Sequence, residues 1–172
     1  DILVNNAGIT WGADFDDYPD AGFSKVMEIN VRSIFSLTRN FAALLQAAGT
    51  PDDPSRVINI GSMDGLHVNN VSRTGTFAYA ASKAAVHHLT RTLAVELASR
   101  NITVNAIAPG FFESKMTKFV FENYKKDIEN NSPLTRIGKP EEMAGLAIYL
   151  ASRAGAYTNG TVIAVDGGTC IA

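Results

Sequence analysis

The segment VINIGS, residues 57–62, decides the fold of this chain. Its first four residues are β-branched and apolar around a single Asn, which is typical of a strand covered on both faces. Gly61 and Ser62 follow at once, and small residues in this place let a ligand approach the backbone. The segment therefore predicts a buried strand that ends at a binding edge.

Three further segments show the same pattern of an apolar run with small or polar residues after it. They are Ile2 to Val4 before Asn5-Asn6-Ala7-Gly8, Ile102 to Ile107 before Pro109-Gly110, and Val162 to Val165 before Asp166-Gly167-Gly168. Longer helical patterns separate these strands, and this alternation is typical of an α/β fold with a mostly parallel sheet. The carboxyl ends of parallel strands share one edge, where open α/β sheets bind ligands.

The helical patterns between the strands have clear limits. Asp20 to Ala47 carries apolar residues at helical spacing and predicts one long helix. A second helix follows Tyr79, and a third runs from Pro140 into Ala151. The polar segment 114–132 between them predicts a mobile lid.

The composition excludes several classes of function. A chain of 172 residues with 46% hydrophobic content is long enough for one globular domain. Its formal net charge of −2 gives no positive field, so we expect neither nucleic-acid nor membrane binding. The single cysteine, Cys170, excludes an internal disulfide, and no run approaches the roughly 18 apolar residues of a spanning helix. We expect a cytoplasmic protein, with an organellar matrix as the alternative.

Tyr79 and Lys83 stand four residues apart at the start of one helix. This spacing places both on the same face, where a nearby ammonium favours the phenolate and lowers the pKa of the phenol. Ser62 ends a neighbouring strand, so its hydroxyl can hold a substrate oxygen beside the phenol. The three side chains predict acid–base work on a carbonyl or an alcohol, and a bound cofactor would have to carry the electrons.

Together with their neighbours, these residues resemble the short-chain dehydrogenase/reductase family over essentially the whole chain. The shared motifs are NNAG at 5–8, Asn30 within EINVRS, GS at 61–62, YAASK at 79–83, VNAIAPG at 104–110 and VDGG at 165–168. A Tyr-x-x-x-Lys motif alone is a weak signal, and the ordered set carries the resemblance. Within the family, RVINIGSMDG, ITVNAIAPGFFESKM and AGAYTNGTVIAVDGG look like the 3-oxoacyl reductases of the rhamnolipid-associated type.

The resemblance implies a Rossmann-like, doubly wound parallel sheet. It also implies an oxidoreductase that transfers a hydride between a nicotinamide cofactor and a carbonyl or alcohol substrate, as a 3-oxoacyl reductase does. Tyr79 would be the proton donor or acceptor, Ser62 would orient the substrate oxygen, and Lys83 would lower the phenol pKa and hold the nicotinamide ribose. Asn30 would support a water-linked proton relay through Lys83.

The same resemblance implies a cofactor site at the strand ends, with NADP favoured over NAD. Its residues would be Asn5, Ala7, Gly8, Tyr79, Lys83, Pro109, Gly110, Phe112 and Ser114. No metal is expected, and the partner would be a small carbonyl or acyl substrate. A homodimer or homotetramer is expected from the family and from a flat Ala side of the helix after Tyr79, formed by Ala81, Ala84 and Ala85.

Two departures from the family pattern stand out. The interval between Ser62 and Tyr79 is longer than usual, so HVNNVSRTGTF, residues 67–77, predicts an enlarged loop that shapes specificity. The family's Gly-rich Thr-Gly-x-x-x-Gly-x-Gly turn has no match, and Asp1 already stands in strand-like sequence. We therefore expect one partial Rossmann domain over residues 1–172, the C-terminal portion with about four strands and flanking helices, in which the catalytic half is present and the adenosine-binding half absent.

Two other functions stay open at the level of sequence. In one, the chain is a catalytically inactive, truncated domain that acts through protein partners. In the other, Ser62 is the nucleophile of a serine hydrolase, with Asp64 or Asp166 as the orienting carboxylate. Against the hydrolase, IGSMD lacks the Gly-x-Ser-x-Gly elbow and no His is expected beside Ser62. The three histidines, His67, His87 and His88, are expected to have packing or surface roles.

Overall fold

A computed structural model describes residues 1–68 and 74–172. Its four strands form one sheet in the order β1-β2-β3-β4, and every neighbouring pair is parallel. The strands are β1 (Ile2–Asn5), β2 (Ser55–Ile60), β3 (Ile102–Pro109) and β4 (Val162–Val165). The predicted parallel α/β sheet is confirmed, and each predicted strand is present, with β2 and β3 extended by about two residues.

The helices lie between the strands as the alternation predicts. The longer ones are α1 (Asp20–Met27), α2 (Ser33–Ala48), α3 (Phe77–Leu97), α4 (Lys118–Asn131) and α5 (Pro140–Ala151). The described residues also form short turns: a π-helical turn η1 (Glu28–Arg32) and the 3₁₀ turns η2 (Met63–Gly65), η4 (Ala98–Arg100), η5 (Arg153–Gly155) and η6 (Thr169–Ile171). Among residues 1–68 and 74–172, no helix is both long and apolar enough to cross a membrane.

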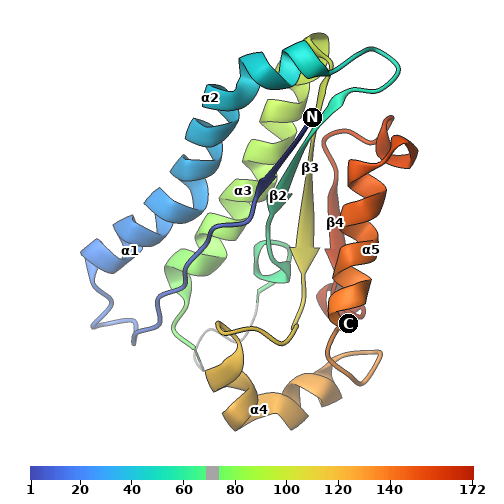
Figure 1. Ribbon diagram of the computed structural model, residues 1–172. Helices are drawn as coiled ribbons and strands as arrows, with labels where there is room; N and C mark the ends of the chain where they lie inside the picture. Colours follow the sequence, from blue (N-terminus) through green and yellow to red (C-terminus); the bar gives the residue numbers. More distant parts are fainter. Residues whose placement is uncertain (69–73) are drawn as a thin grey trace.

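Helices cover both faces of the sheet (Figure 1), and each face has its own core. On the side of α2 and α3, Val57 and Val104 pack against Leu45, Leu93 and other apolar residues of these helices. On the side of α5, the neighbouring strand residues Ile58 and Ile107 pack against Leu150. The alternation of Val57 and Ile58 between two cores explains why the strand has almost no polar face.

The edge strand β1 differs from the expectation that every strand is covered on both faces. Leu3 packs against the core on the α2 and α3 side, whereas Ile2 is 50% exposed and Val4 is 51% exposed. The α5 helix packs mainly on β2 and β3. The expectation was therefore wrong for β1, because its apolar sequence does not say which neighbours cover it.

The predicted long helix is present, but a π-helical turn interrupts it at Asn30. α1, η1 and α2 follow one another from Asp20 to Ala48, and the Ser33 N–H donates to the Glu28 carbonyl five residues earlier. A π turn inserts one extra residue into the helix and is frequent at functional sites. Apolar periodicity does not detect this turn, since the buried stripe continues on both sides of it.

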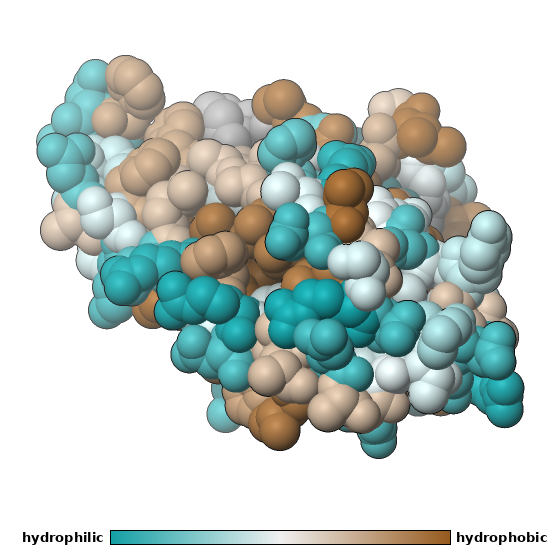
Figure 2. Space-filling view, turned by 90° about the horizontal axis from the view of Figure 1, so that it is seen from above, coloured by the Kyte–Doolittle hydropathy of each residue, from teal (hydrophilic) through white to brown (hydrophobic). Residues whose placement is uncertain are grey.

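The two ends of the sheet differ in what covers them. All four strands point toward the end where α4 lies across the molecule (Figure 1), so the segment predicted as a lid is largely helical. The opposite end, seen in Figure 2, shows a band of hydrophilic side chains across its middle with hydrophobic side chains between them. The strand ends that the sequence marks as a binding edge all lie at the α4 end.

Candidate active site

Ser62 follows β2 directly and begins the turn η2. Its backbone is extended (φ −168°, ψ 154°), and its Oγ accepts a hydrogen bond of 3.1 Å from the N–H of Asp64. Tyr79 lies in the first turn of α3, near enough for the Ser62 side chain to lower the pKa of its phenol. The structure thus joins the two residues expected to hold and protonate a substrate oxygen.

Lys83 lies one turn farther along α3 and is only 6% exposed. Its Nζ donates a 2.8 Å hydrogen bond to the carbonyl of Ile60, at the end of β2, and lies 5.4 Å from the centroid of the Tyr79 ring. Burial lowers the pKa of Lys83 to about 8, and the negative charge of Asp64 opposes this shift. The ammonium is therefore held at the strand edge, close enough to the phenol to influence it.

The acidity of Tyr79 differs from the sequence-based expectation. Burial raises the pKa of the phenol, the hydrogen bond with Ser62 lowers it, and the charge of Asp64 raises it again. The net shift is upward, whereas the sequence pattern predicts a lowered phenol pKa, because burial outweighs the opposing influence of Ser62. The physical reason is that the buried phenol loses contact with water, which disfavours the charged phenolate.

Asn30 is buried in the π turn and binds two other segments. Its Oδ1 accepts from the N–H of Ile9 and its Nδ2 donates to the carbonyl of Ile9, both at 2.9 Å. Nδ2 also donates to Oγ of Ser82, which lies beside Lys83 in α3. A Cβ placed on Gly8 would lie 3.5 Å from Asn30 Oδ1 and 3.7 Å from Lys83 Nζ, so these three predicted residues converge.

Asn5 supports the same edge from inside the sheet. Its Nδ2 donates to Oδ1 of Asn59 at 2.8 Å and to Oγ1 of Thr38 at 3.3 Å, which ties β1 to β2 and α2. Its own Oδ1 is buried and has no hydrogen-bond partner in the described structure. Ala7, two residues further, is exposed where the chain leaves β1. Asn5 therefore orients the strand end, and Ala7 leaves that end open.

The end of β3 approaches β4 so closely that only a glycine fits. Pro109 is the last residue of β3, and the N–H of Gly110 donates to the carbonyl of Val165 at 2.8 Å. A Cβ on Gly110 would lie 2.7 Å from Cα of Asp166. Gly110 is thus fixed at the binding edge by the packing of two strand ends.

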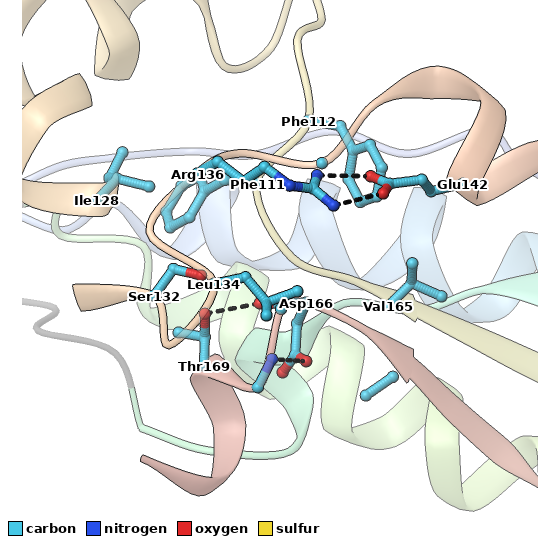
Figure 3. A pocket seen from close by; sticks show the side chains of 14 residues that line it. Phe111, Phe112, Ile128, Ser132, Leu134, Arg136, Glu142, Val165, Asp166 and Thr169 are labelled. Atoms are coloured by element: carbon cyan, nitrogen blue, oxygen red, sulfur yellow. Dashed lines mark hydrogen bonds and ion pairs between the residues drawn. The ribbon is translucent and has the colours of Figure 1, made fainter. Parts of the chain in front are cut away.

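Phe112 and Ser114 make their described contacts with residues outside the cluster around Lys83. The Phe112 ring packs on Gly138, while Ser114 is exposed and its Oγ lies 3.0 Å from Oγ1 of Thr117. Phe112 lines a cavity of about 470 Å³ between the end of β4 and the segment before α5. Figure 3 shows its ring beside the ion pair of Arg136 and Glu142. None of Asn30, Ser62, Tyr79 and Lys83 lines this cavity.

The sequence analysis missed two contacts of the Ser62 turn. His87 is 2% exposed, and its Nε2 accepts a hydrogen bond of 3.4 Å from the backbone N–H of Ser62. The sulfur of Cys170 lies 3.8 Å from the carbonyl oxygen of Met63 and 3.6 Å from Nδ1 of His67. The expectation that no His lies beside Ser62 was wrong. The spacing of four residues between Lys83 and His87 is the signal that places the ring on this face.

Two further expectations concern the surroundings of the site. The enlarged loop predicted over residues 67–77 falls partly on residues 69–73, which lie outside the described residues. In the part of the chain that the structure describes, no three His, Cys, Asp or Glu side chains come close enough to hold a metal ion.

A parallel sheet with Ser62, Tyr79, Lys83 and Asn30 gathered at its carboxyl edge defines a class of protein. The family model described as Enoyl-(Acyl carrier protein) reductase matches residues 1–170. The chain belongs to the short-chain dehydrogenase/reductase family.

Individual relatives narrow the comparison. The chain is 48% identical to the rhamnolipids biosynthesis 3-oxoacyl-[acyl-carrier-protein] reductase of Pseudomonas aeruginosa, over 98% of this chain and 65% of that protein. It is 39% identical to 3-oxoacyl-[acyl-carrier-protein] reductase FabG of Thermotoga maritima, over 99% of this chain and 66% of the relative.

Solved structures agree with these relatives. The Pseudomonas aeruginosa RhlG/NADP active-site complex superposes with a TM-score of 0.94 at 46% identity, covering 99% of this chain and 66% of that one. A gluconate 5-dehydrogenase from Burkholderia cenocepacia, in complex with NADP and tartrate, gives a TM-score of 0.90 at 32% identity over 100% of this chain and 65% of its own. The chain thus spans about two thirds of the length of the proteins that it matches.

Proposed function

We propose that this chain carries the catalytic residues of a nicotinamide-dependent oxidoreductase that interconverts a carbonyl and an alcohol, most closely a 3-oxoacyl reductase. The observation that carries the proposal is the convergence of Ser62, Tyr79 and Lys83 at one strand edge, where Lys83 Nζ binds the Ile60 carbonyl beside the Tyr79 ring. The relatives named as 3-oxoacyl reductases, at 48% and 39% identity, support the acyl substrate. In this proposal residues 1–172 form one partial Rossmann domain that holds the catalytic half.

The residues at the strand edge fit the nicotinamide and ribose part of such a cofactor. Gly8 presents no side chain next to Lys83 and Asn30, so the backbone of β1 can come close to a ligand there. Lys83 has three donor positions, and the Ile60 carbonyl uses one of them. We assign ribose binding to Tyr79 and Lys83. Asn5, Ala7, Gly8, Pro109, Gly110, Phe112 and Ser114 would border the rest of this part of the cofactor. NADP is favoured over NAD, since the neighbours solved with a nicotinamide cofactor include NADP complexes.

The chain's own residues would hold the substrate oxygen and move one proton. When bound, the nicotinamide cofactor supplies the pair of electrons and the hydrogen that the carbonyl carbon takes up. The Ser62 hydroxyl holds the substrate oxygen beside the phenol, and Tyr79 gives its proton to that oxygen as negative charge develops. A raised phenol pKa keeps Tyr79 protonated at neutral pH, which suits reduction of a carbonyl. Lys83 and Asn30 would support the return of a proton to Tyr79.

The contacts of Ser62 speak against a serine hydrolase. The only imidazole contact of Ser62 that the structure describes is made by its backbone N–H, which donates to His87. Its Oγ instead accepts a hydrogen bond from the Asp64 N–H and lies near the Tyr79 side chain. A nucleophilic serine needs a base at its hydroxyl, and this geometry does not provide one.

The proposal also includes a homo-oligomeric assembly and a reducing cellular compartment. A homodimer or homotetramer is supported by the exposed small residues Ala81 and Ala84 on α3. Cys170 is a free cysteine, which fits a reducing compartment such as the cytoplasm. The rival proposal is an inactive domain that acts through protein partners.

Replacement of Tyr79 by Phe tests the proposed proton donor. Tyr79→Phe removes one hydroxyl and leaves the ring, so we expect the rate of carbonyl reduction with NADPH or NADH to fall by about 10²–10⁴-fold while the fold persists. The control is Tyr157→Phe, because Tyr157 is fully exposed and lies outside the cluster. Turnover is followed by loss of nicotinamide absorbance and the fold by circular dichroism. An active Tyr79→Phe protein would refute the assigned donor, and a wild-type chain that folds but binds neither cofactor would favour the rival domain.

A further inference from the structure

We propose that His87 is a positioning residue that fixes the Ser62 turn and thereby the direction of the Ser62 hydroxyl. The inference rests on the proposed function, in which Ser62 holds the substrate oxygen. The sequence motifs of the family resemblance do not include His87. In the structure His87 is buried and also forms a hydrogen bond to the backbone of Ser62.

His87 reaches the turn from the same face of α3 as Lys83, one helical turn farther on. Its Nε2 accepts the N–H of Ser62 at 3.4 Å, and its ring lies between two glycines that flank the turn. A Cβ on Gly61 would lie 2.7 Å from Cδ2 of the ring, and a Cβ on Gly65 would lie 2.7 Å from Cε1. Real Cβ atoms essentially never approach so closely, so the ring and both glycines fit only together.

The two glycines explain why the turn needs an external support. Glycine has more backbone freedom than any other residue, so a turn with Gly61 before Ser62 and Gly65 after it is intrinsically loose. The imidazole fills the space between them and binds the one backbone N–H that belongs to Ser62. Without the ring, the Ser62 backbone could leave its extended conformation, and its hydroxyl would lose its fixed direction toward Tyr79.

The proton state of His87 matches this role. A ring nitrogen accepts a hydrogen bond only when it carries no proton, so this contact assigns the proton of a neutral ring to Nδ1, which is buried without a hydrogen-bond partner in the described structure. Burial lowers the pKa of His87, the positive charges of Arg91 and Lys83 on the same helix lower it further, and the Gly65 backbone opposes the shift. The neutral ring therefore persists at neutral pH, where the substrate oxygen would be held.

The test combines nuclear magnetic resonance with turnover in three variants. The ¹⁵N shifts of His87 report whether Nε2 is unprotonated, and amide exchange reports the protection of the Ser62 N–H. His87→Gln keeps a polar group near the position of Nε2, His87→Leu keeps volume without an acceptor, and His88→Leu is the matched control because His88 is exposed. We expect His87→Leu to lose at least about fivefold of the Ser62 protection. We expect its kcat to fall about tenfold or more, with an unchanged Kd for the cofactor.

The outcomes separate this inference from the proposed function. Retention of protection and kcat in His87→Gln and His88→Leu, with loss of both in His87→Leu, supports positioning. A protonated Nε2 in the wild type, or full Ser62 protection in a folded His87→Leu, overturns it. If His87→Leu does not fold, the inference is tested by the wild-type ¹⁵N shifts, which must show an unprotonated Nε2, and by His87→Gln, which must retain the Ser62 protection. If Tyr79→Phe keeps its activity, the proposed function fails, while Ser62 protection by His87 is still measured independently.

Discussion

At the scale of single residues, burial shapes the acidity of the candidate site more than the proximity of charges does. Tyr79 and Lys83 both lose contact with water, and burial disfavours the charged form of each. The pKa of the phenol rises and that of the ammonium falls to about 8. Both groups are therefore biased toward their neutral forms, and a protonated phenol is the form that can donate to a reduced substrate oxygen.

Lys83 should titrate near pH 8 in the folded protein without cofactor. Its chain-end resonances, followed by NMR against a Lys83→Met spectrum for assignment, should give a pKa of about 8 instead of the ordinary 10.5. Between these values the unfolded chain binds more protons than the folded chain, so the free energy of unfolding rises with pH across this window. The full rise is about 3 kcal/mol relative to Lys83→Met. A pKa of 10 or above would show that water reaches the ammonium.

At the scale of elements, the π turn η1 connects the helix of Asn30 to the segment after β1. The extra residue of a π turn changes the direction in which the side chain at this position leaves the helix axis, compared with a regular α-helix. Asn30 then reaches both backbone groups of Ile9 and the hydroxyl of Ser82 at 2.9 Å. This one side chain thus connects the segment after β1 to α3 at the candidate site.

Loss of the Asn30 side chain should destabilise the fold. Asn30→Ala removes three hydrogen bonds, two of them to the backbone of Ile9, so we expect the free energy of unfolding to fall by about 2–4 kcal/mol. Asn40→Ala on α2 is the control, because Asn40 is exposed and its replacement should cost less than about 0.5 kcal/mol. Urea unfolding measures both variants. Equal midpoints would mean that water replaces the amide without cost.

At the scale of the whole molecule, the outer face of the helices next to the core carries unusual apolar exposure. On α3, Val95 is 82% exposed and lies on the same outer stripe as Ala84 and His88. On α2, Leu44 is 67% exposed and Phe41 is 43% exposed. Apolar side chains and small residues gathered on adjacent helices are typical of a surface that packs against a second copy.

A charge on this face should dissociate the expected homo-oligomer. Val95→Glu places a carboxylate where a two-fold interface would bring it opposite its own copy, so we expect the sedimentation coefficient to fall to that of a monomer. Tyr157→Glu is the matched control, since Tyr157 is fully exposed and lies between η5 and β4, outside α2 and α3. If the wild type already sediments as a monomer at micromolar concentration, the proposed assembly is wrong.

The sequence by itself determined the elements and most of the candidate site. Apolar runs followed by small residues predict the four strands and the edge that their ends share. They can do so because the side-chain period of a strand depends only on residues close together in the sequence. The spacing of four residues likewise predicts that Tyr79 and Lys83 lie on the same face of one helix. Ser62, Asn30 and Gly8 were predicted from motifs, and the structure brings these three together with Tyr79 and Lys83.

Only the tertiary structure decided the burial, the acidity and the support of these residues. The upward pKa shift of Tyr79 depends on how much water its neighbours exclude, which no local pattern records. The exposed face of β1 depends on how far α5 extends across the sheet. The place of His87 between Gly61 and Gly65 depends on the packing of α3 against β2, and the offset of Phe112 from Lys83 depends on its packing on Gly138. Segments that are distant in the sequence determine each of these four features, because burial arises only when the fold is assembled.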